Sequence, residues 1–431
     1  MTNQPPADRS RREFARLFAF GGSAALFTAS AGAWRGTPQV AGPAPSSTDE
    51  RYWAGVRSGF VMPEGLACLN AANLCPSPAR VLDAYFDSTR SVDRDPSPQN
   101  RQKTRTGREA TRRALAASLR VTPEEIVITR NTSESNNFVS SGLDLKAGDE
   151  VLIFSDNHPS NHAAWRQKAE RFGFLVRTIE RVHPHPGPDY YVEAFRRQLT
   201  ARTRVVAFTH VTASVGDLLP AAELCALARE HGALSLVDGA QSFGVLDLDL
   251  SKMEPDFFTG SAHKWPCGPK ECGVLFVNRR IHDRIRPSIV SLYPGEVGIS
   301  RTMEAFGQRD EPSIVGFGDA LALQATIGRA AIERRARELA QVLVTGLRAI
   351  DGVRVWTDDD PNRSGAIVSF QPAGLDVRKL HQALYESEGI VCATRPGSDR
   401  GGLRFSPHFY NLHAEMGRAI DAVRKYVARG V

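Results

Sequence analysis

The sequence predicts an α/β fold, with a large domain built on a mostly parallel seven-stranded sheet and a smaller α+β domain at the C-terminus. Short, nearly continuous apolar runs recur between residues 100 and 300, as in strands buried on both faces of a parallel sheet. Helical patterns separate these runs, which is the alternation typical of α/β proteins. After about residue 310 the pattern changes to long helical periodicity mixed with short strands.

The elements of the large domain follow from these patterns in chain order. The expected strands are residues 125–130, 151–155, 174–179, 205–209, 233–237, 257–259 and 273–277. The expected helices between them are residues 108–119, 192–199 and 222–231. We therefore place the large domain at residues 96–310, preceded by an N-terminal segment at 50–95.

The smaller domain is predicted for residues 311–431. Residues 314–350 give helical periodicity long enough for one long helix or for two in series. The further expected elements are strands at 353–356, 366–370 and 403–406, and helices at 377–387 and 412–428.

The first 33 residues have the order of an export signal. The sequence SRREF at residues 10–14 precedes an apolar stretch, and Ala31-Gly32-Ala33 forms a small-residue cleavage pattern. The paired arginines resemble a twin-arginine (Tat) signal; the alternative is an N-terminal amphipathic helix. We expect export by the Tat translocase to the periplasm or the medium, with no stable membrane span after cleavage. Residues 34–49, small and proline-rich, are predicted to form a flexible linker.

Charge and cysteine content exclude some classes of partner. The net charge of +6 is scattered along the chain, so we expect no nucleic-acid partner. The six cysteines form no C-x-x-C motif and no zinc-finger spacing, so we expect no metal site. Buried, reduced thiols are the default expectation, with a Cys267–Cys272 disulfide as the alternative.

Three polar stretches follow predicted strands, where ligands bind in open α/β sheets. The hydroxyl-rich turn TRNTSES at residues 129–135 opens a probable helix and suits a phosphate, although such turns also serve as plain helix caps. Asp238, in the sequence DGAQ, is able to bind a pyridinium nitrogen, to act as a structural cap through its side chain, or to bind a metal. Lys264, in SAHKW, gains a lowered pKa if it is desolvated, and it then forms a Schiff base with an aldehyde.

The order of these three stretches resembles fold-type I enzymes that depend on pyridoxal 5′-phosphate (PLP). In particular, a hydroxyl-rich turn, then DGAQ, then S-x-H-K about two dozen residues later, is similar to the class V aminotransferase family. The likeness extends from about residue 69 to residue 426 and is greatest to the isopenicillin N epimerase-like branch, through the segment HVT at residues 210–212.

The resemblance implies a role for each matching residue. Lys264 forms the Schiff base with PLP, and Asp238 pairs with the pyridine nitrogen. His158, in NHPSN, stacks on the ring, and Arg404 binds the substrate α-carboxylate with its guanidinium fork. The alternative for His158 is a histidine in a surface loop, and the alternative for Arg404 is a structural salt bridge. The other cofactor-binding residues that the resemblance implies are Gln241 at the ring oxygen O3′ and Thr132, Ser133, Ser261 and His263 at the phosphate.

Two further assignments depend on less of the motif. Many relatives carry an asparagine where this chain has Ala213, so Thr212 or Ser214 is expected to take its place near the ring oxygen. Gln308 or Arg309 lies where relatives reach across a dimer interface to the partner's phosphate. The resemblance therefore also implies a homodimer.

The implied reaction acts on an amino acid through an external aldimine and a Cα carbanion, and ends in transamination or epimerisation. Cysteine desulfurases need a nucleophilic cysteine in the loop that here spans residues 394–402, and this loop has none. A C–S lyase or a desulfurase-like enzyme is the first alternative. An exported, non-catalytic binding protein with the same fold is the second.

Overall fold

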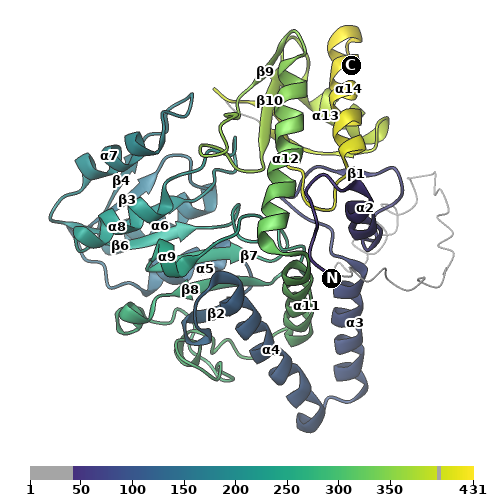
Figure 1. Cartoon of the computed structure of the whole chain (residues 1–431). Coiled ribbons are helices and arrows are strands. Elements are labelled where there is room, and N and C mark those ends of the chain that lie inside the picture. The colour runs from purple at the N-terminus through teal and green to yellow at the C-terminus, as the bar shows by residue number, and fades with distance from the viewer. Residues whose placement is uncertain (1–41, 396–398) are drawn as a thin grey trace, which may run out of the picture. The chain divides into compact units, whose positions relative to one another are not determined.

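The computed structural model describes residues 42–395 and 399–431, which belong to one compact unit (Figure 1). The predicted export signal and the first part of the linker lie outside the described residues. A seven-stranded sheet forms the centre of this unit, with the strand order β2-β8-β7-β6-β5-β3-β4. Its strands are β2 (Ile126–Thr129), β3 (Glu150–Phe154), β4 (Leu175–Ile179), β5 (Thr203–Thr209), β6 (Leu234–Asp238), β7 (Phe257–Ser261) and β8 (Gly273–Val277).

The sheet is mixed but mostly parallel. Strands β4, β3, β5, β6 and β7 pair in parallel, whereas β8 runs antiparallel to both of its neighbours, β7 and β2. As a result β2 points in the same direction as the five parallel strands. The predicted fold class and all seven predicted strands are confirmed, with ends that differ by one to two residues.

Helices cover both faces of the sheet, which explains why its strands are apolar almost throughout. Along β5, Val206 and Phe208 pack in one hydrophobic cluster with α4, α7, α8 and α11, whereas Val205 and Ala207 pack in a second cluster with α5 and α6. This alternation is the period of two expected for a strand buried on both sides. The helices are α4 (Pro98–Leu119), α5 (Thr132–Gly142), α6 (Pro159–Phe172), α7 (Pro188–Gln198), α8 (Ala221–Glu230) and α11 (Glu311–Ile327), with the short α9 (Leu250–Met253), α10 (Ser300–Met303) and 3-10 turns Pro123–Glu125 and Arg279–Arg284.

The C-terminal part has the α+β composition that the sequence predicts. The long periodic stretch is two helices in series, α11 and α12 (Arg329–Arg348), separated at Gly328, whose φ of 93° is open to glycine and strained for other residues. An antiparallel sheet of order β12-β13-β10-β9 lies beside them. Its strands are β9 (Val353–Val355), β10 (Val368–Pro372), β12 (Ala393–Arg395) and β13 (Gly402–Phe405), accompanied by α13 (Val377–Glu386), β11 (Ile390–Val391) and α14 (His413–Arg429).

The second half of the predicted linker is tied to the body of the protein. Ala44 donates its backbone N–H to Ile327 O at 3.0 Å, and Ser46 O accepts a hydrogen bond from Trp53 Nε1 at 2.9 Å. These bonds fix residues 44–46 beside α2 (Glu50–Ser58) and the end of α11, so this part differs from the flexible linker that we expected. The chain then continues through β1 (Ala67–Cys68), which pairs with β11, and α3 (Ala79–Arg94).

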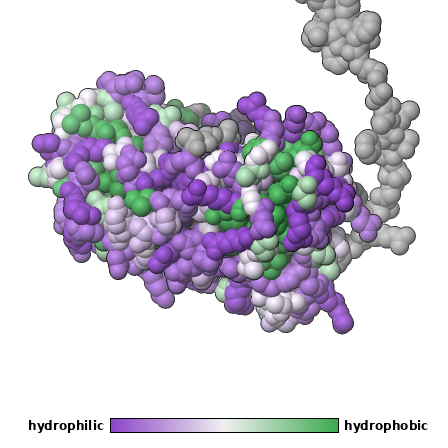
Figure 2. All heavy atoms as spheres, turned by 90° about the horizontal axis from the view of Figure 1, so that it is seen from above, coloured by the Kyte–Doolittle hydropathy of each residue, from purple (hydrophilic) through white to green (hydrophobic). Residues whose placement is uncertain are grey.

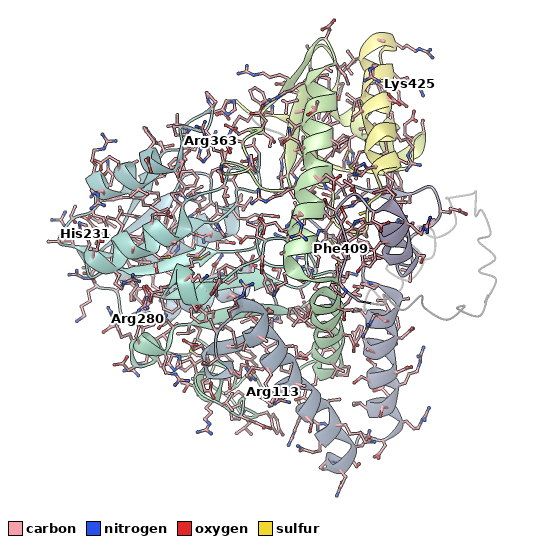
Figure 3. All side chains as sticks on the ribbon, viewed as in Figure 1. Arg113, His231, Arg280, Arg363, Phe409 and Lys425 are labelled. Carbon is pink, nitrogen blue, oxygen red and sulfur yellow. The ribbon has the colours of Figure 1, made fainter. Side chains whose placement is uncertain are left out.

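The described surface is mainly hydrophilic, with smaller hydrophobic patches between hydrophilic residues on the face that Figure 2 shows. Charged side chains such as Arg113, Arg280 and Lys425 lie around the outside, whereas Phe409 is fully buried (Figure 3). All six cysteines are free and buried, so no Cys267–Cys272 disulfide is formed. Within the described ranges, no helix combines the length and apolar character needed to cross a bilayer.

Candidate active site

The predicted functional residues gather at one edge of the central sheet. Because β2, β3, β5, β6 and β7 point the same way, their carboxyl ends meet at the same edge, where ligands bind in open α/β sheets. The hydroxyl-rich turn follows β2, His158 follows β3, and Thr212 follows β5. Asp238 is the last residue of β6, and Lys264 follows β7. The topology therefore brings together residues that are up to 135 positions apart in the sequence.

Asp238 is a buried carboxylate held by two donors. Its side chain is 1% exposed, and its Oδ2 accepts a hydrogen bond from Asn136 Nδ2 at 2.9 Å. Its Oδ1 accepts one from the backbone N–H of Ala240 at 3.1 Å. A carboxylate oxygen accepts about two hydrogen bonds, so each oxygen keeps capacity for a further donor. Asn136 was not identified from the sequence, although it lies one helical turn after Thr132 on α5, at a spacing that places both on one face.

Gly239, the residue after Asp238, allows the turn after β6 to pack closely against β7. A Cβ on this residue would lie 2.0 Å from the ring atom Cζ of Phe258, so a side chain has no room. The close contact between the turn after β6 and the ring on β7 thus needs glycine. This gives a steric reason for the second residue of the DGAQ motif.

Burial lowers the pKa of Lys264 from its ordinary value, because removal from water disfavours the ammonium form. The Asp238 carboxylate acts in the opposite direction, and the Arg395 guanidinium lowers the pKa of Lys264 further. The amine is therefore neutral in a larger fraction of molecules than a surface lysine at the same pH. A neutral amine is the form that attacks an aldehyde and accepts a proton.

His158 is the N-cap residue of α6, where the helix fixes its ring. Its Nδ1 accepts a hydrogen bond from the backbone N–H of Ser160 at 3.2 Å and lies 2.8 Å from Ser160 Oγ. Burial lowers the pKa of His158, and Lys264 lowers it further. The ring is thus neutral, and because Nδ1 accepts, the proton is assigned to Nε2.

The hydroxyl-rich turn and the end of β7 form one polar cradle. The backbone N–H of Thr132 donates to Ser261 Oγ at 2.9 Å, and the hydroxyls of Thr132 and Ser261 lie 2.8 Å apart. Ser133 Oγ donates to Ser160 Oγ at 3.1 Å. These hydroxyls lie at the N-terminus of α5, which attracts anions. The pKa of His263 falls to about 4 because it is buried beside Lys264 and Lys270, so this ring is neutral too.

Three predicted cofactor-binding residues have protein partners of their own. The Gln241 amide donates through Nε2 to Ala72 O and accepts through Oε1 from Trp265 Nε1, each at 2.9 Å. Thr212 Oγ1 accepts from the backbone N–H of Asp217 at 2.9 Å, and Ser214 donates its hydroxyl to Asp156. These contacts hold Gln241, Thr212 and Ser214 at the edge of the site. Their contact with a cofactor stays a prediction.

Arg404 lies on β13, with its guanidinium directed at the loop after β5. Its Nη1 donates to Ala213 O at 2.7 Å and its Nη2 to Asn70 Oδ1 at 3.4 Å, whereas its buried Nε has no partner among the described residues. No carboxylate of the described chain forms an ion pair with Arg404. The structural salt bridge, which was the alternative for this residue, is therefore absent from this part of the chain.

Gln308 and Arg309 both bind residues of their own chain. Arg101 Nη2 donates to Gln308 Oε1 at 2.7 Å, and Arg309 Nη2 donates to Ile128 O at 3.0 Å. Arg309 also lies 3.7 Å from the buried carboxylate of Glu304. Their predicted contact with a partner's phosphate has no counterpart in a single chain, so it stays a prediction.

A cavity of about 770 Å³ opens between α6, the loop after β5 and the segment around β12. His158 and Ser214 line it, together with charged residues that sequence reasoning did not identify, Asp156, Arg395 and Arg400. Asp156 lies two residues after the end of β3, and this position was the available sequence signal. Arg400 donates to Asp156 at 2.7 Å and to Asp217 at 3.1 Å, and it thereby holds its loop against the large sheet.

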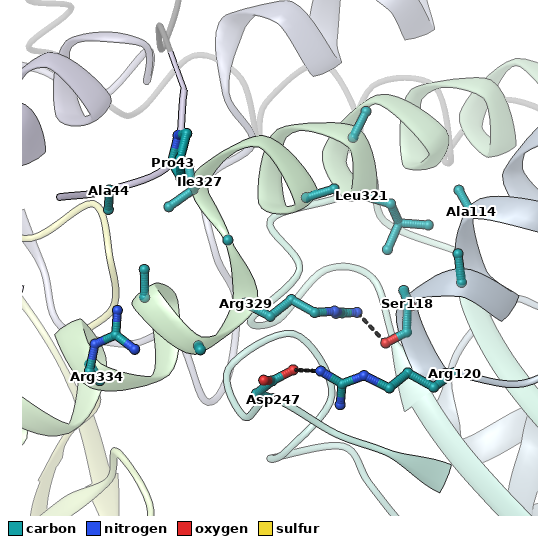
Figure 4. Close-up of a pocket in the computed structure, with 16 residues that line it drawn as sticks. Pro43, Ala44, Ala114, Ser118, Arg120, Asp247, Leu321, Ile327, Arg329 and Arg334 are labelled. Carbon is teal, nitrogen blue, oxygen red and sulfur yellow. Dashed lines mark hydrogen bonds and ion pairs between the residues drawn. The ribbon is translucent and has the colours of Figure 1, made fainter. Parts of the chain in front are cut away.

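A second cavity of about 590 Å³ lies away from these residues, between α4, α11 and α12 (Figure 4). Alanines line much of it, and three of its four charged residues bind one another or the backbone. Arg120 pairs with Asp247 at 2.7 Å, and Arg329 donates to Ser118 O at 2.5 Å. It contains none of the predicted site residues.

The donor set at the sheet edge fits PLP. A helix N-terminus with three hydroxyls suits the phosphate, a buried carboxylate with spare capacity suits the pyridine nitrogen, and a desolvated lysine suits the aldehyde. The unpartnered Nε of Arg404 suits the carboxylate of an amino acid. The described residues contain no cluster of His, Cys, Asp and Glu placed to hold a metal ion.

Comparison with known proteins places this site in a family. The sequence model of the class V aminotransferases matches residues 71–418. Isopenicillin N epimerase of Amycolatopsis lactamdurans is 32% identical over 394 residues, covering 86% of this chain and 98% of the relative. Cysteine desulfurase of Haloferax volcanii is 31% identical over 322 residues, covering 70% of this chain and 74% of the relative.

Solved structures agree with the fold. The cystine C–S lyase C-DES, in complex with its product cysteine persulfide, superimposes with a TM-score of 0.78 at 26% identity, over 84% of this chain and 98% of that chain. A mutant form of C-DES with glycine covalently linked to PLP gives a TM-score of 0.79 at 27% identity, over 85% of this chain and 98% of that chain.

We predict that the pKa of Lys264, measured in the cofactor-free protein, lies below that of an ordinary lysine and moves in opposite directions in two variants. Asp238→Asn removes the charge that favours the ammonium form, so the pKa should fall further. Arg395→Gln removes a charge that disfavours it, so the pKa should rise. The measurement is the pH dependence of Lys264 modification by an amine reagent, followed by peptide mass spectrometry. The same direction of change in both variants would contradict the electrostatic account.

Proposed function

The chain belongs to the class V aminotransferase family of PLP enzymes, and from this premise we propose that it moves the Cα proton of an amino acid, in transamination or epimerisation. The observation that carries the proposal is the buried lysine beside a buried carboxylate at one sheet edge, Lys264 with Asp238. When bound, PLP supplies a sink for the electron pair that the Cα–H bond leaves behind.

The chain's own residues divide the remaining work. The Lys264 amine, whose pKa is lowered by burial, accepts the Cα proton and returns it. Asp238, whose side chain is fixed by the hydrogen bonds from Asn136 and Ala240, is placed to accept a hydrogen bond from the ring nitrogen that the cofactor would present. Arg404 orients the substrate through its α-carboxylate, and the neutral ring of His158 closes the site beside α6.

Desulfuration by this chain is disfavoured because its cysteine thiols are buried. Cys392, the cysteine nearest to the loop at 394–402, is buried between β11 and β12, and burial raises its pKa to about 12. Nucleophilic attack needs a thiolate, which such a group does not supply at neutral pH. Likeness to C-DES supports a C–S lyase as the second candidate, because elimination also begins with Cα proton removal and needs no cysteine.

We also propose that the protein is a homodimer. The loop between residues 286 and 298 exposes a run of apolar side chains, with Val290 84% and Leu292 69% exposed beside Ile289 and Tyr293. Contiguous exposed apolar side chains of this kind mark interaction surfaces. The loop lies next to a cavity of about 340 Å³ that Ile289 and Arg309 line, which supports a shared phosphate site.

Export through the Tat pathway is proposed on sequence grounds. The paired Arg11 and Arg12, the apolar stretch and the cleavage pattern at residues 31–33 occur in the required order. A pathway for folded cargo also suits a protein whose cofactor and six reduced, buried thiols are in place before export. The mature protein would then act in the periplasm or the medium.

We expect the PLP-loaded enzyme to exchange the Cα hydrogen of an amino acid for deuterium in D2O, measured by NMR against L- and D-amino acids. Inverted product without a keto acid identifies an epimerase, and keto-acid-dependent turnover identifies an aminotransferase. Lys264→Ala should abolish exchange. Arg404→Gln should raise KM about 10- to 100-fold through loss of charge-assisted bonds. Absence of deuterium at Cα with every amino acid, with the cofactor bound, would overturn the proposal.

Light scattering after size-exclusion chromatography should give the mass of a dimer for the wild-type protein. The double variant Val290→Asp and Leu292→Asp places charges in the proposed interface, so it should give the mass of a monomer. Phe172→Asp places a charge at another exposed apolar residue, 43% exposed on α6, and serves as the control. A monomeric wild type at micromolar concentration would contradict the dimer.

A fusion of residues 1–49 to a reporter that is active after Tat export should be exported in a bacterial host with that pathway. Replacement of both Arg11 and Arg12 by lysine should remove almost all export, whereas Arg9→Lys should not. N-terminal sequencing should place the mature terminus at Trp34. Export that persists without the arginine pair would refute the Tat assignment.

A further inference from the structure

We infer that Arg395 binds a second anionic group, at the end of the substrate's side chain, so that the preferred substrates are amino acids with an acidic side chain. This inference rests on the proposed function and deepens it by naming the substrate class. It depends on three features of the cavity beside His158: an arginine without a counter-ion, its position relative to Arg404, and the pairing of most of the other charges.

The Arg395 guanidinium is mostly buried and incompletely satisfied. Its Nη2 donates to Ala213 O at 2.6 Å, but its buried Nε has no partner among the described residues. No carboxylate in the described ranges lies within ion-pair distance of it. Burial lowers its pKa, whereas the more distant charge of Asp156, which forms its ion pair with Arg400, raises it. A buried cation without a counter-ion is costly for a fold, and a guanidinium fork matches a carboxylate in geometry. A carboxylate that enters with the substrate would supply the missing charge.

The strand register places Arg395 and Arg404 on one face of the small sheet. Residue pairs across β12 and β13 are Ala393 with Arg404 and Arg395 with Gly402. Directly paired residues share a face, and so do residues two apart on one strand. Arg395 is therefore the diagonal neighbour of Arg404, opposite a residue with no side chain. Both guanidiniums donate to the same oxygen, Ala213 O, at 2.6 and 2.7 Å, so they flank a single point.

Most of the other charged residues that line the cavity already have partners. Arg400 binds Asp156 and Asp217, and Arg181 binds Asp399 through both carboxylate oxygens at 2.7 Å. Arg166, exposed on α6 at the rim, forms no ion pair within the described part of the chain and adds positive charge. The exposed Glu180 also lines the cavity and adds a negative charge.

The cavity joins Arg395 to the reaction site. Arg395 is close enough to Lys264 and His158 to lower the pKa of each, and it lines the same space of about 770 Å³ as His158. A substrate whose α-carboxylate lies on Arg404 is thus able to extend its side chain toward Arg395. Neutral side chains would enter the same space but leave the Arg395 charge uncompensated.

The test compares acidic amino acids with their side-chain amides, which match them in shape. The PLP-loaded enzyme is assayed by Cα deuterium exchange with aspartate, glutamate and 2-aminoadipate, each against its amide. We expect kcat/KM for at least one acid to exceed that of its amide by about 10-fold or more, as for a charge-assisted pair. In Arg395→Gln this ratio should fall to near one, and Arg395→Lys should restore part of it. Arg378→Gln, an exposed position on α13, removes the same charge elsewhere and should keep the ratio.

A binding measurement separates this inference from the proposed function. Calorimetry of the PLP-loaded enzyme with glutarate and with its neutral monoamide needs no turnover, and glutarate should bind more tightly to the wild type but not to Arg395→Gln. Such discrimination without Cα exchange would support the Arg395 site while refuting the proposed reaction. Exchange with equal preference for acids and amides, or a preference that survives Arg395→Gln, would overturn the inference.

Discussion

The pairing of β6 with β7 is the interaction on which the site depends. Its register sets Asp238 opposite Thr259, and Thr259 Oγ1 donates to Asn136 Oδ1 at 3.2 Å while Asn136 Nδ2 donates to Asp238. Thr259 on β7, Asn136 on α5 and Asp238 on β6 thus form one buried chain of hydrogen bonds. Strand β7, which pairs with β6, is followed closely by Lys264. The strand pairing that builds the core therefore also brings Asp238 and Lys264 to one buried edge of the sheet.

Much of this arrangement is predictable from the sequence because it is local. Strands buried on both faces are recognisable by unbroken apolar runs such as VLIF and VVAF, and the residues that end them occupy the carboxyl edge of a parallel sheet. Asp238 and Lys264 are therefore found by position as well as by resemblance. The break between α11 and α12 was left open, since one glycine within a periodic stretch fits a continuous helix as well as two.

The features that escaped prediction are those that tertiary contacts decide. Asn136 looks like one polar residue among several in TSESNN, and only the packing of α5 against β7 selects it as the partner of Asp238. Arg395 lies near the start of a stretch, residues 394–402, that the sequence marks mainly by its lack of cysteine, and its importance comes from the β12–β13 register. Residues 44–46 have the composition of a linker but are held by Ile327 and Trp53, which are remote from them or follow them in sequence.

The antiparallel strand β8 has a consequence for the order of folding. The edge strand β2 pairs with β8 alone, through residues such as Thr129 and Gly273 that are far apart in the chain. Contacts between remote segments form late, after the loop between them has closed. During synthesis, the strand that carries the hydroxyl-rich turn therefore waits for residues 273–277 to leave the ribosome. A fragment that ends before β8 would contain Asp238 and Lys264 but would lack the strand that pairs with β2, the strand from which the hydroxyl-rich turn begins.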